Sequence, residues 1–420
     1  MPRRHRQSDT RAAFTLIELL VVIAILAVLA TVIVVVINPA ELLKKGRDTT
    51  RLSDLAALHS AISLYQVDRN DTFFGTSSVL YVSIPDTSLT CANTGLPALP
   101  SGWTYHCEST STFMNVNGTG WLPVNLTQIS SGSPLPRLPV DPVNTTSSGL
   151  YYTYTPGGSW ELTTLLESLQ NKYGNTNSLM LKDGGDTAMM YELGSDLVLS
   201  PVRDTNLIGL WKLDEGSGLT ANDSSTSSNP GTLLGGTAWQ SSCKSNSCAS
   251  FDGINDSIST TASILNNVSN FSISLWVNPT SFGGWKGIIG KGLGDNNVIT
   301  IQAHTGGQMF VDVDNGVSNS FGNTSAGVLS TGQWYHLVMT YDGNGATNAD
   351  KLKLYVNGTN TALSFTGSIP AQTGGTNTGI LYIGQLGYAS NYFNGLVDDV
   401  RIYSHTLSPI EVTGIYNAQK

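Results

Sequence analysis

The chain has 420 residues, of which 40% are hydrophobic, so it is long enough for two or three domains and wholesale disorder is excluded. Only 12% of the residues are charged, the formal net charge is −9, and no basic stretch follows residues 1–11, which argues against nucleic-acid binding through a folded basic face. The four cysteines form no CxxC pair, which argues against a zinc ribbon or a thioredoxin-type site.

The first forty residues differ most in composition from the rest. Residues 1–11 are rich in arginine, and residues 14–37 form an apolar run with one charged side chain, Glu18. About 20 apolar residues in a helix cross the hydrocarbon core of a bilayer. A basic flank on the N-terminal side keeps that end in the cytoplasm. The pattern therefore predicts a single membrane-spanning helix over 14–37, with the bulk of the chain outside the cytoplasm.

The small residues Ala12 and Ala13 precede the apolar run instead of following it, unlike a secretory signal. Cleavage after Ala13 would remove a leader of residues 1–13 and leave the apolar helix in place. The stretch 13–18, AFTLIE, resembles the prepilin leader of type IV pilins and type II secretion pseudopilins, with Ala13 where the family usually has Gly.

This resemblance implies a prepilin peptidase as processing partner, cutting between Ala13 and Phe14, and methylation of the new amine on Phe14. It also implies that Glu18 pairs with the amine of a neighbouring pilin or pseudopilin subunit and sets the stagger of a filament. An ionised carboxylate in hydrocarbon is costly unless it is paired. The alternative is a plain membrane anchor in which Glu18 lies near the lipid headgroups.

Residues 38–204 are expected to form an amphipathic helix and a pilin-like globular domain. Asn38-Pro39 predicts a kink, after which one helix face carries Leu52, Leu55, Leu58, Ile62 and Tyr65. Arg47, Asp48, Arg51 and Asp54 are expected mostly on other faces. Residues 150–154 and 160–163 predict a hairpin around Pro156-Gly157-Gly158, and the resemblance to major pseudopilins implies a small antiparallel sheet.

An exported location favours disulfides. Cys91 and Cys107 enclose a loop that looks like an insertion in the pilin-like domain, and Cys243 and Cys248 enclose a short loop further on. Each pair is predicted to form a disulfide.

Residues 205–420 have the short strands and frequent turns of an all-β sandwich or jelly roll. Strands are predicted at 271–277, 334–341, 351–356 and 396–403, a hairpin turn at Asn357-Gly358, and a capped terminal helix from Ser408. The segments LWKLDEGSG (210–218), FDGIND (251–256), QWYH (333–336), YVNG (355–358) and FNGLVDDVRIY (393–403) resemble, in this order, LamG-like members of the concanavalin A-like jelly roll family.

The jelly roll resemblance implies carbohydrate binding or adhesion and a structural Ca²⁺. For calcium it implies carboxylates from Asp214 and Asp398 with a carbonyl near Gly253, and Asp252 or Asp256 as alternatives. The other interpretation is that these aspartates cap turns. Trp285, Tyr388 and Tyr392 lie in predicted loops and are the candidate glycan contacts; loop packing is the alternative for each.

Catalysis is not expected. A retaining glycosidase needs two carboxylates about 5–5.5 Å apart. After residue 205 the only glutamates are Glu215 and Glu411, both outside the predicted strands. Asp312 and Asp314 share one face of a strand and are expected to be solvated.

The sequence as a whole predicts an α+β pilin-like N-terminal part, with a long helix and a small antiparallel sheet, followed by an all-β jelly roll sandwich. The expected function is a pilin-like or pseudopilin envelope protein that displays a LamG-like carbohydrate-binding or adhesion domain on a pilus, a pseudopilus or the cell surface. The alternatives are a membrane-anchored enzyme acting on polysaccharide and a type II secretion pseudopilin whose jelly roll binds only other secretion proteins.

Overall fold

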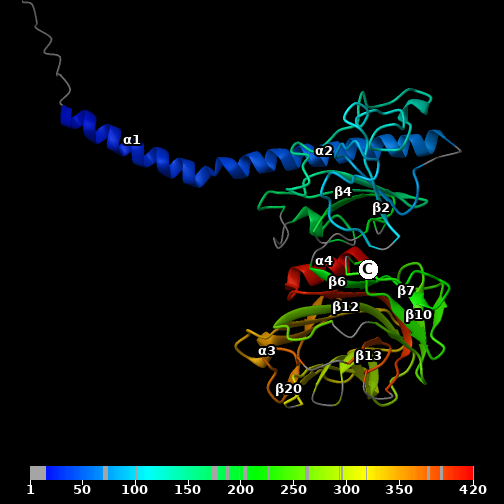
Figure 1. Ribbon diagram of the computed structural model, residues 1–420. Helices are drawn as coiled ribbons and strands as arrows, with labels where there is room; N and C mark the ends of the chain where they lie inside the picture. The colour runs from blue at the N-terminus through cyan, green and yellow to red at the C-terminus, as the bar shows by residue number, and fades with distance from the viewer. Residues whose placement is uncertain are drawn as a thin grey trace, which may run out of the picture.

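The computed structural model describes residues 16–419, except for residues 70–73, 101, 172–177, 186, 188, 198, 202–205, 226, 261–263, 293, 295–296, 318, 376–378 and 388–390. Figure 1 shows helix α1 projecting to the left from an N-terminal globular part, with a β-rich C-terminal domain below that part. The predicted boundary between residues 204 and 205 lies outside the described residues, and the first strand after it begins at Leu207.

The N-terminal helix is divided at the predicted position. Helix α1 spans Leu16–Ile37 and helix α2 spans Pro39–Asp68. Asn38 lies between them with a positive φ of 43°, its side chain accepts a hydrogen bond from the backbone N–H of Glu41, and Pro39 begins the new helix. A proline fits the first turn of a helix but cannot continue one without a break, so the kink follows from the sequence.

Helix α2 packs against the N-terminal sheet through the predicted apolar stripe. Leu55, Leu58, Ile62 and Tyr65 are buried together with Trp121, Tyr154 and Leu162. The expectation that Asp48 and Arg51 lie on other faces is wrong, since both are at most 1% exposed. The buried stripe extends to these two charged residues because Arg51 pairs with Asp48 and with the loop carboxylates of Asp141 and Glu167.

The N-terminal sheet has the order β2-β1-β3-β4-β5. Its strands are β1 (Val79–Val82), β2 (Thr104–His106), β3 (Thr153–Pro156), β4 (Trp160–Thr164) and β5 (Tyr191–Gly194), accompanied by the short helices η1 (Leu126–Gln128) and η2 (Leu179–Leu181). The β3–β4 hairpin lies where it was predicted, with Pro156 opposite Trp160.

The expectation of a purely antiparallel sheet is wrong in one pairing. Strands β1 and β2 are parallel, while the other pairs are antiparallel. Two parallel neighbours need a long crossover connection, and residues 83–103 provide it. The predicted Cys91–Cys107 disulfide is present and closes this connection onto the end of β2.

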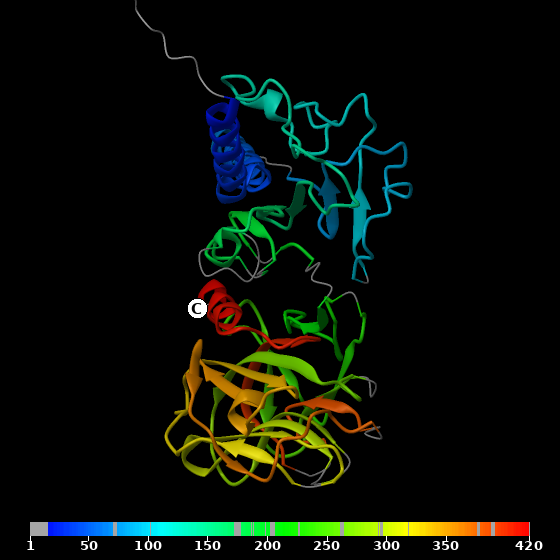
Figure 2. The ribbon, with the colours of Figure 1, turned by 90° about the vertical axis from the view of Figure 1, so that its left-hand side faces the viewer.

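Two facing sheets form the C-terminal domain (Figures 1 and 2). The first has the order β19-β18-β17-β12-β22-β10-β9, with β6 also paired to β22. Its strands are β6 (Leu207–Trp211), β9 (Ala238–Gln240), β10 (Cys248–Asp252), β12 (Asn270–Pro279), β17 (Tyr335–Asp342), β18 (Leu352–Val356), β19 (Thr359–Thr361) and β22 (Asn394–Tyr403).

The second sheet has the order β20-β16-β15-β14-β13-β21-β11-β8-β7. Its strands are β7 (Thr220–Ala221), β8 (Gly231–Leu234), β11 (Ser257–Ser259), β13 (Lys286–Gly292), β14 (Val298–His304), β15 (Gln308–Val313), β16 (Phe321–Asn323), β20 (Ser364–Thr366) and β21 (Leu381–Ile383). The short helices η3 (Thr305–Gly307) and α3 (Asn348–Lys351) lie in connections.

The space between the sheets is a continuous apolar core, because alternate residues of each strand point into it; examples are Ile273 and Leu275 from β12 and Ile299 and Ile301 from β14. This two-sheet arrangement is compatible with the expected jelly roll. The turn at Asn357-Gly358 joins β18 to β19, and both residues have positive φ, as a tight hairpin requires.

The terminal helix α4 (Pro409–Gln419) begins at the predicted cap, where Ser408 and Glu411 exchange backbone-to-side-chain hydrogen bonds. Its apolar side packs on the outer face of the first sheet through Val412 and Ile415. In both views α4 lies on the side of the domain that faces the N-terminal part (Figures 1 and 2).

Candidate functional site

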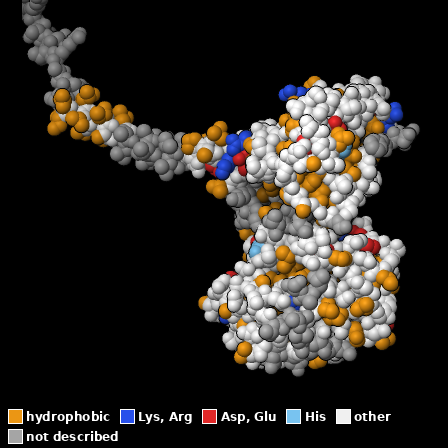
Figure 3. All heavy atoms as spheres, in the orientation of Figure 1, with side chains coloured by type: hydrophobic (Ala, Val, Ile, Leu, Met, Phe, Trp, Pro, Cys, Tyr) orange, Lys and Arg blue, Asp and Glu red, His pale blue; other side chains and the backbone are white. Residues whose placement is uncertain are grey.

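The N-terminal processing residues Ala13 and Phe14 lie outside the described residues. Glu18 is in the first turn of α1, between apolar side chains that are largely exposed, such as Ile17 at 70% and Leu19 at 58% (Figure 3). Within the part of the chain that the structure describes, no helix meets the length and apolarity needed to cross a membrane.

Asp214 and Asp398 hold the same loop, the one that the predicted Cys243–Cys248 disulfide closes. Asp398 Oδ2 accepts the backbone N–H of Ser245 at 3.0 Å, and Asp214 Oδ1 accepts that of Ser247 at 3.2 Å. Burial raises the pKa of Asp398 to about 8 and that of Asp214 to about 6. Both aspartates therefore fix this loop through its amides.

Asp252 and Gly253 lie at a different place. In the ladder between β10 and β22, Asp252 is opposite Asn394, and Asp398 lies four residues further along the same strand, about 13 Å away. Asp252 caps its own turn by accepting the N–H of Ile254, and its N–H is donated to Asp256. The expectation of one calcium site shared by Asp214, Asp398 and the Gly253 carbonyl is therefore wrong in its geometry.

Among the described residues, no group of three or more His, Cys, Asp and Glu side chains is arranged to hold a metal ion. One observation fits a cation bound at Asp398. The Oδ1 atom of Asp398 is fully buried and has no hydrogen-bond partner within the described part of the chain. Nearby, the Lys244 ammonium lies 4.3 Å from the centre of the Trp276 ring, and its charge interacts with Asp398.

Trp285 stands at the start of β13 with 42% of its surface exposed. Its ring centre lies 4.4 Å from that of His304 and 4.6 Å from that of Phe310, and Phe310 lies 5.7 Å from Phe321. These four rings, which we call the Trp285 strip, run across β13–β16 on the face turned away from the core. The rings are tilted by 51–67° to one another, so each offers its own surface for contact.

Tyr392 lies next to the Trp285 strip and is half-buried. Gly287, two residues after Trp285, donates its N–H to the carbonyl of Asn391 at 3.0 Å and forms a bridge with Tyr392. Tyr388 lies outside the described residues. The sequence reasoning missed His304, Phe310 and Phe321, although their alternation with core residues such as Ile301 and Val311 signals an outward face.

Asp312 and Asp314 share the outward face of the β15 segment, but the expectation that they are solvated is wrong, because they are 7% and 1% exposed. Asp312 Oδ2 accepts hydrogen bonds from Thr300 Oγ1 at 2.9 Å and Gln302 Nε2 at 2.7 Å. Asp314 Oδ1 accepts two from Ser320.

Each of these carboxyl groups has its other oxygen buried without a hydrogen-bond partner in the described part of the chain. Burial raises the pKa of Asp312 to about 7 and that of Asp314 to about 6. A buried carboxyl group with half of its hydrogen-bonding capacity unused favours the neutral form.

Two family models match the chain. Residues 9–34 match the prokaryotic N-terminal methylation motif, and residues 252–413 match the concanavalin A-like lectin/glucanases superfamily. The chain thus carries both of the features that the sequence analysis identified. No curated protein is similar enough to this chain to count as a relative.

Several solved structures resemble part of the chain. Domain 4 of AbnA, a GH43 extracellular arabinanase from Geobacillus stearothermophilus, in complex with arabinotriose, is 23% identical, with 50% of this chain and 98% of that one covered and a TM-score of 0.40. Trypanosoma rangeli sialidase is 15% identical, with 51% and 33% covered and a TM-score of 0.36. The binding domain of botulinum neurotoxin serotype G is 15% identical, with 50% of each chain covered and a TM-score of 0.40.

Proposed function

We propose that this protein is a pilin-like or pseudopilin subunit of the bacterial envelope that a prepilin peptidase cuts between Ala13 and Phe14, and that its C-terminal domain binds carbohydrate on the outside. The observation that carries the proposal is the presence of an N-terminal methylation motif and a concanavalin A-like domain at opposite ends of one chain. A domain displayed beyond the membrane by a filament subunit is well placed to meet surface glycans.

The proposed anchor is the apolar run 14–37, with its arginine-rich flank in the cytoplasm. The described part of α1 exposes apolar side chains around Glu18 and would bury them against lipid or the helices of other pilin or pseudopilin subunits. Glu18 would then pair with the methylated amine of Phe14 in a neighbouring subunit, because a carboxylate among apolar helices needs a cationic partner.

The proposed sugar contact on the C-terminal domain is Trp285 with Tyr392 and Tyr388. Trp285 is 42% exposed and its ring contacts that of Phe310 at an interplanar angle of 67°, so a partly exposed ring held by a neighbouring aromatic side chain is offered to a sugar. Trp285→Ala is expected to weaken glycan binding, while Trp239→Ala at the edge of the first sheet serves as the tryptophan control.

Calcium at Asp214 and Asp398 is part of the proposal. A cation there would satisfy the buried Asp398 Oδ1 and offset the repulsion among the clustered carboxylates. Thermal unfolding of the full chain should then occur a few degrees higher in calcium than in EDTA, by mass action on the folded state. Asp398→Asn should abolish this difference, and an equal Tm in both buffers for the wild type would exclude the ion.

A second candidate is a membrane-anchored enzyme acting on polysaccharide, favoured by the buried, largely neutral Asp312 beside Asp314. A neutral carboxyl group can donate a proton to a leaving group. A reducing-sugar assay of the full chain, with Asp312→Asn as the control, separates the two candidates, since binding without turnover supports the first.

The main experiment is mass spectrometry of the mature N-terminus after co-expression with a prepilin peptidase. The expected mature chain begins at methylated Phe14, and the same protein made without the peptidase should begin at Met1. An uncut chain in the presence of an active peptidase would leave only an anchored domain. A glycan array with the full chain then tests carbohydrate binding. An array without any bound glycan would favour the alternative of a secretion pseudopilin whose domain contacts only other secretion proteins.

A further inference from the structure

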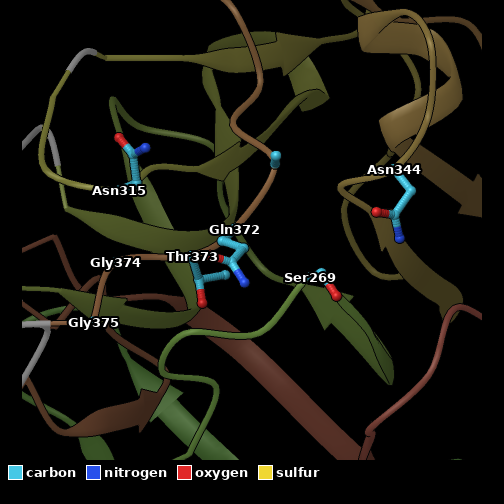
Figure 4. Close-up of a pocket in the computed structure, with 8 residues that line it drawn as sticks. Ser269, Asn315, Asn344, Gln372, Thr373, Gly374 and Gly375 are labelled. Carbon is cyan, nitrogen blue, oxygen red and sulfur yellow. The ribbon is translucent and has the colours of Figure 1, made fainter.

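A pocket of about 560 Å³ lies at one end of the C-terminal sandwich, where loops from both sheets meet. Ser269 precedes β12, Asn315 follows β15, Asn344 follows β17, and residues 371–375 connect β20 to β21. In Figure 4, Gln372 and Thr373 lie between Asn315 on one side and Ser269 and Asn344 on the other. We call it the amide pocket.

The rim of the amide pocket is held by backbone hydrogen bonds and by the hydroxyl group of Thr373. Thr373 donates its N–H to the carbonyl of Val268, and its hydroxyl oxygen accepts the N–H of Val268 at 3.0 Å and donates to the carbonyl of Leu265. Gly343 donates its N–H to the carbonyl of Ser269 at 2.6 Å. A Cβ atom at Gly374 would lie 2.5 Å from Asn297 Oδ1, so a larger residue there would require the Asn297 side chain to shift. The backbone of the rim is therefore fixed before any ligand arrives, whereas the exposed side chains of Asn315, Asn344 and Gln372 would be ordered on binding.

The side chains that line the amide pocket have unused hydrogen-bonding capacity. Those of Ser269, Asn344 and Gln372 make no hydrogen bond within the described part of the chain, and Asn315 Oδ1 accepts one from the Val317 N–H. Each amide offers both donors and acceptors, and none of the lining residues carries a charge.

This chemistry selects the class of ligand. A charged ligand would lose water without gaining a partner of opposite charge, and an apolar ligand would leave the amides unsatisfied. A neutral sugar presents several hydroxyl groups that both donate and accept, and the volume lies within the range of about 300–1,000 Å³ common for small-molecule sites. We propose that the amide pocket binds a neutral sugar unit of a glycan.

The amide pocket is separate from the Trp285 strip. Lys286, the residue after Trp285, is paired with Ala303 of β14, and Ala303 is paired with Met309 near the start of β15. Trp285 therefore lies at the end of the second sheet where β15 begins. Asn315 follows the opposite end of β15. Six residues of strand span about 20 Å. The inference rests on the proposed carbohydrate-binding function but assigns a second, independent place for it.

The test uses the full chain in detergent and isothermal titration with the neutral oligosaccharide that binds best in a glycan screen. Asn344→Ala and Gln372→Ala are each expected to weaken binding about 3- to 10-fold, and the double variant more than about 10-fold. Asn360→Ala, an exposed amide on β19, is the matched control and should bind like the wild type. In the Trp285→Ala background, which removes the other proposed sugar contact, the same pocket substitutions should weaken the remaining binding by the same factor.

The outcomes separate the inference from the proposed function. If Trp285→Ala removes neutral-glycan binding while the pocket variants retain it, the pocket inference is wrong and carbohydrate binding stands. If the wild type binds only acidic glycans, the neutral class is wrong. If the wild type binds no glycan at all, both the pocket inference and the carbohydrate part of the proposed function fail, whereas the N-terminal processing is judged separately by mass spectrometry.

Discussion

Single residues decide how the polar interior of this protein is stabilised. Asp312 and Arg51 are both almost completely buried, yet they represent opposite solutions. Arg51 is surrounded by carboxylates and keeps its charge, whereas Asp312 has only neutral donors and favours its neutral form. These two environments lead to different predictions for substitution.

Asp312→Asn is expected to stabilise the C-terminal domain at alkaline pH. The pKa of Asp312 is raised to about 7, compared with about 3.9 in an unfolded chain. The folded state therefore holds the Asp312 proton more tightly than the unfolded state does. The contribution of this proton to the free energy of unfolding is complete below pH ~4 and is lost as the pH rises to about 7. The neutral asparagine should raise the free energy of unfolding at pH 8 by up to about 4 kcal/mol and flatten the dependence between these pH values.

Urea denaturation at pH 4.5 and pH 8 measures this effect. Asp350→Asn is the contrasting control, because hydrogen bonds from Thr347 lower the pKa of Asp350 and its replacement should give no gain at pH 8. An Asp312→Asn variant that is less stable than the wild type at pH 8 would contradict the argument.

Arg51→Met is expected to destabilise the N-terminal part by about 3–5 kcal/mol. Arg51 binds Asp141 in a bidentate pair at 2.6 and 3.0 Å and also donates to Asp48 and Glu167. Its removal leaves buried carboxylates without their cation. Chemical denaturation of the full chain measures the loss, and Arg137→Met, an exposed arginine, should change stability by less than about 0.5 kcal/mol. Equal effects of the two substitutions would show that the buried network has no net role.

At the scale of elements, helix α2 connects α1 to the N-terminal globular part. Helix α2 contributes to the stability of this part through one buried stripe, while its other described side chains are half-buried or exposed. The same helix therefore offers a matched pair of leucines, Leu58 at 0% exposure and Leu64 at 41%.

Leu58→Ala should destabilise the N-terminal part by about 2–5 kcal/mol, because it leaves a cavity between α2 and the sheet. Leu64→Ala should change the free energy of unfolding by less than about 0.5 kcal/mol. Both values come from urea titrations of the full chain, and a large loss for Leu64→Ala would mean that this face of α2 is covered by something else.

At the scale of the whole molecule, the proposed function joins an assembling helix to a binding domain through the N-terminal globular part. Figure 1 shows α1 projecting away from both globular parts, and the apolar side chains described in its first part, up to Leu26, are accessible to lipid or to other helices. Assembly and glycan binding should therefore be separable by substitution.

Glu18→Ala is expected to leave cleavage and glycan binding intact but to reduce incorporation into filaments at least tenfold, since the proposed partner amine loses its carboxylate. Fractionation of sheared filaments with quantitative immunoblotting measures the change, and mass spectrometry of the same sample checks cleavage. Normal incorporation of the Glu18→Ala subunit would refute the assembly role.

The sequence alone determined the features that depend on neighbours along the chain. The apolar run with Glu18, the break at Asn38-Pro39, the turn at Asn357-Gly358 and the capped helix after Ser408 are all local patterns, and the described elements follow them. Alternation along a strand also separates an inward from an outward face.

Only the tertiary structure decided what covers each face. Asp48, Arg51, Asp312 and Asp314 look solvated in sequence but are buried. Partners ten or more residues away pair with the first three, and Ser320, six residues away, binds Asp314. The register of β10 against β22 separated Asp252 from Asp398, and the meeting of four loops formed the amide pocket. Strand order and loop packing are set by long-range contacts, and no periodicity along the chain encodes which distant segments will meet.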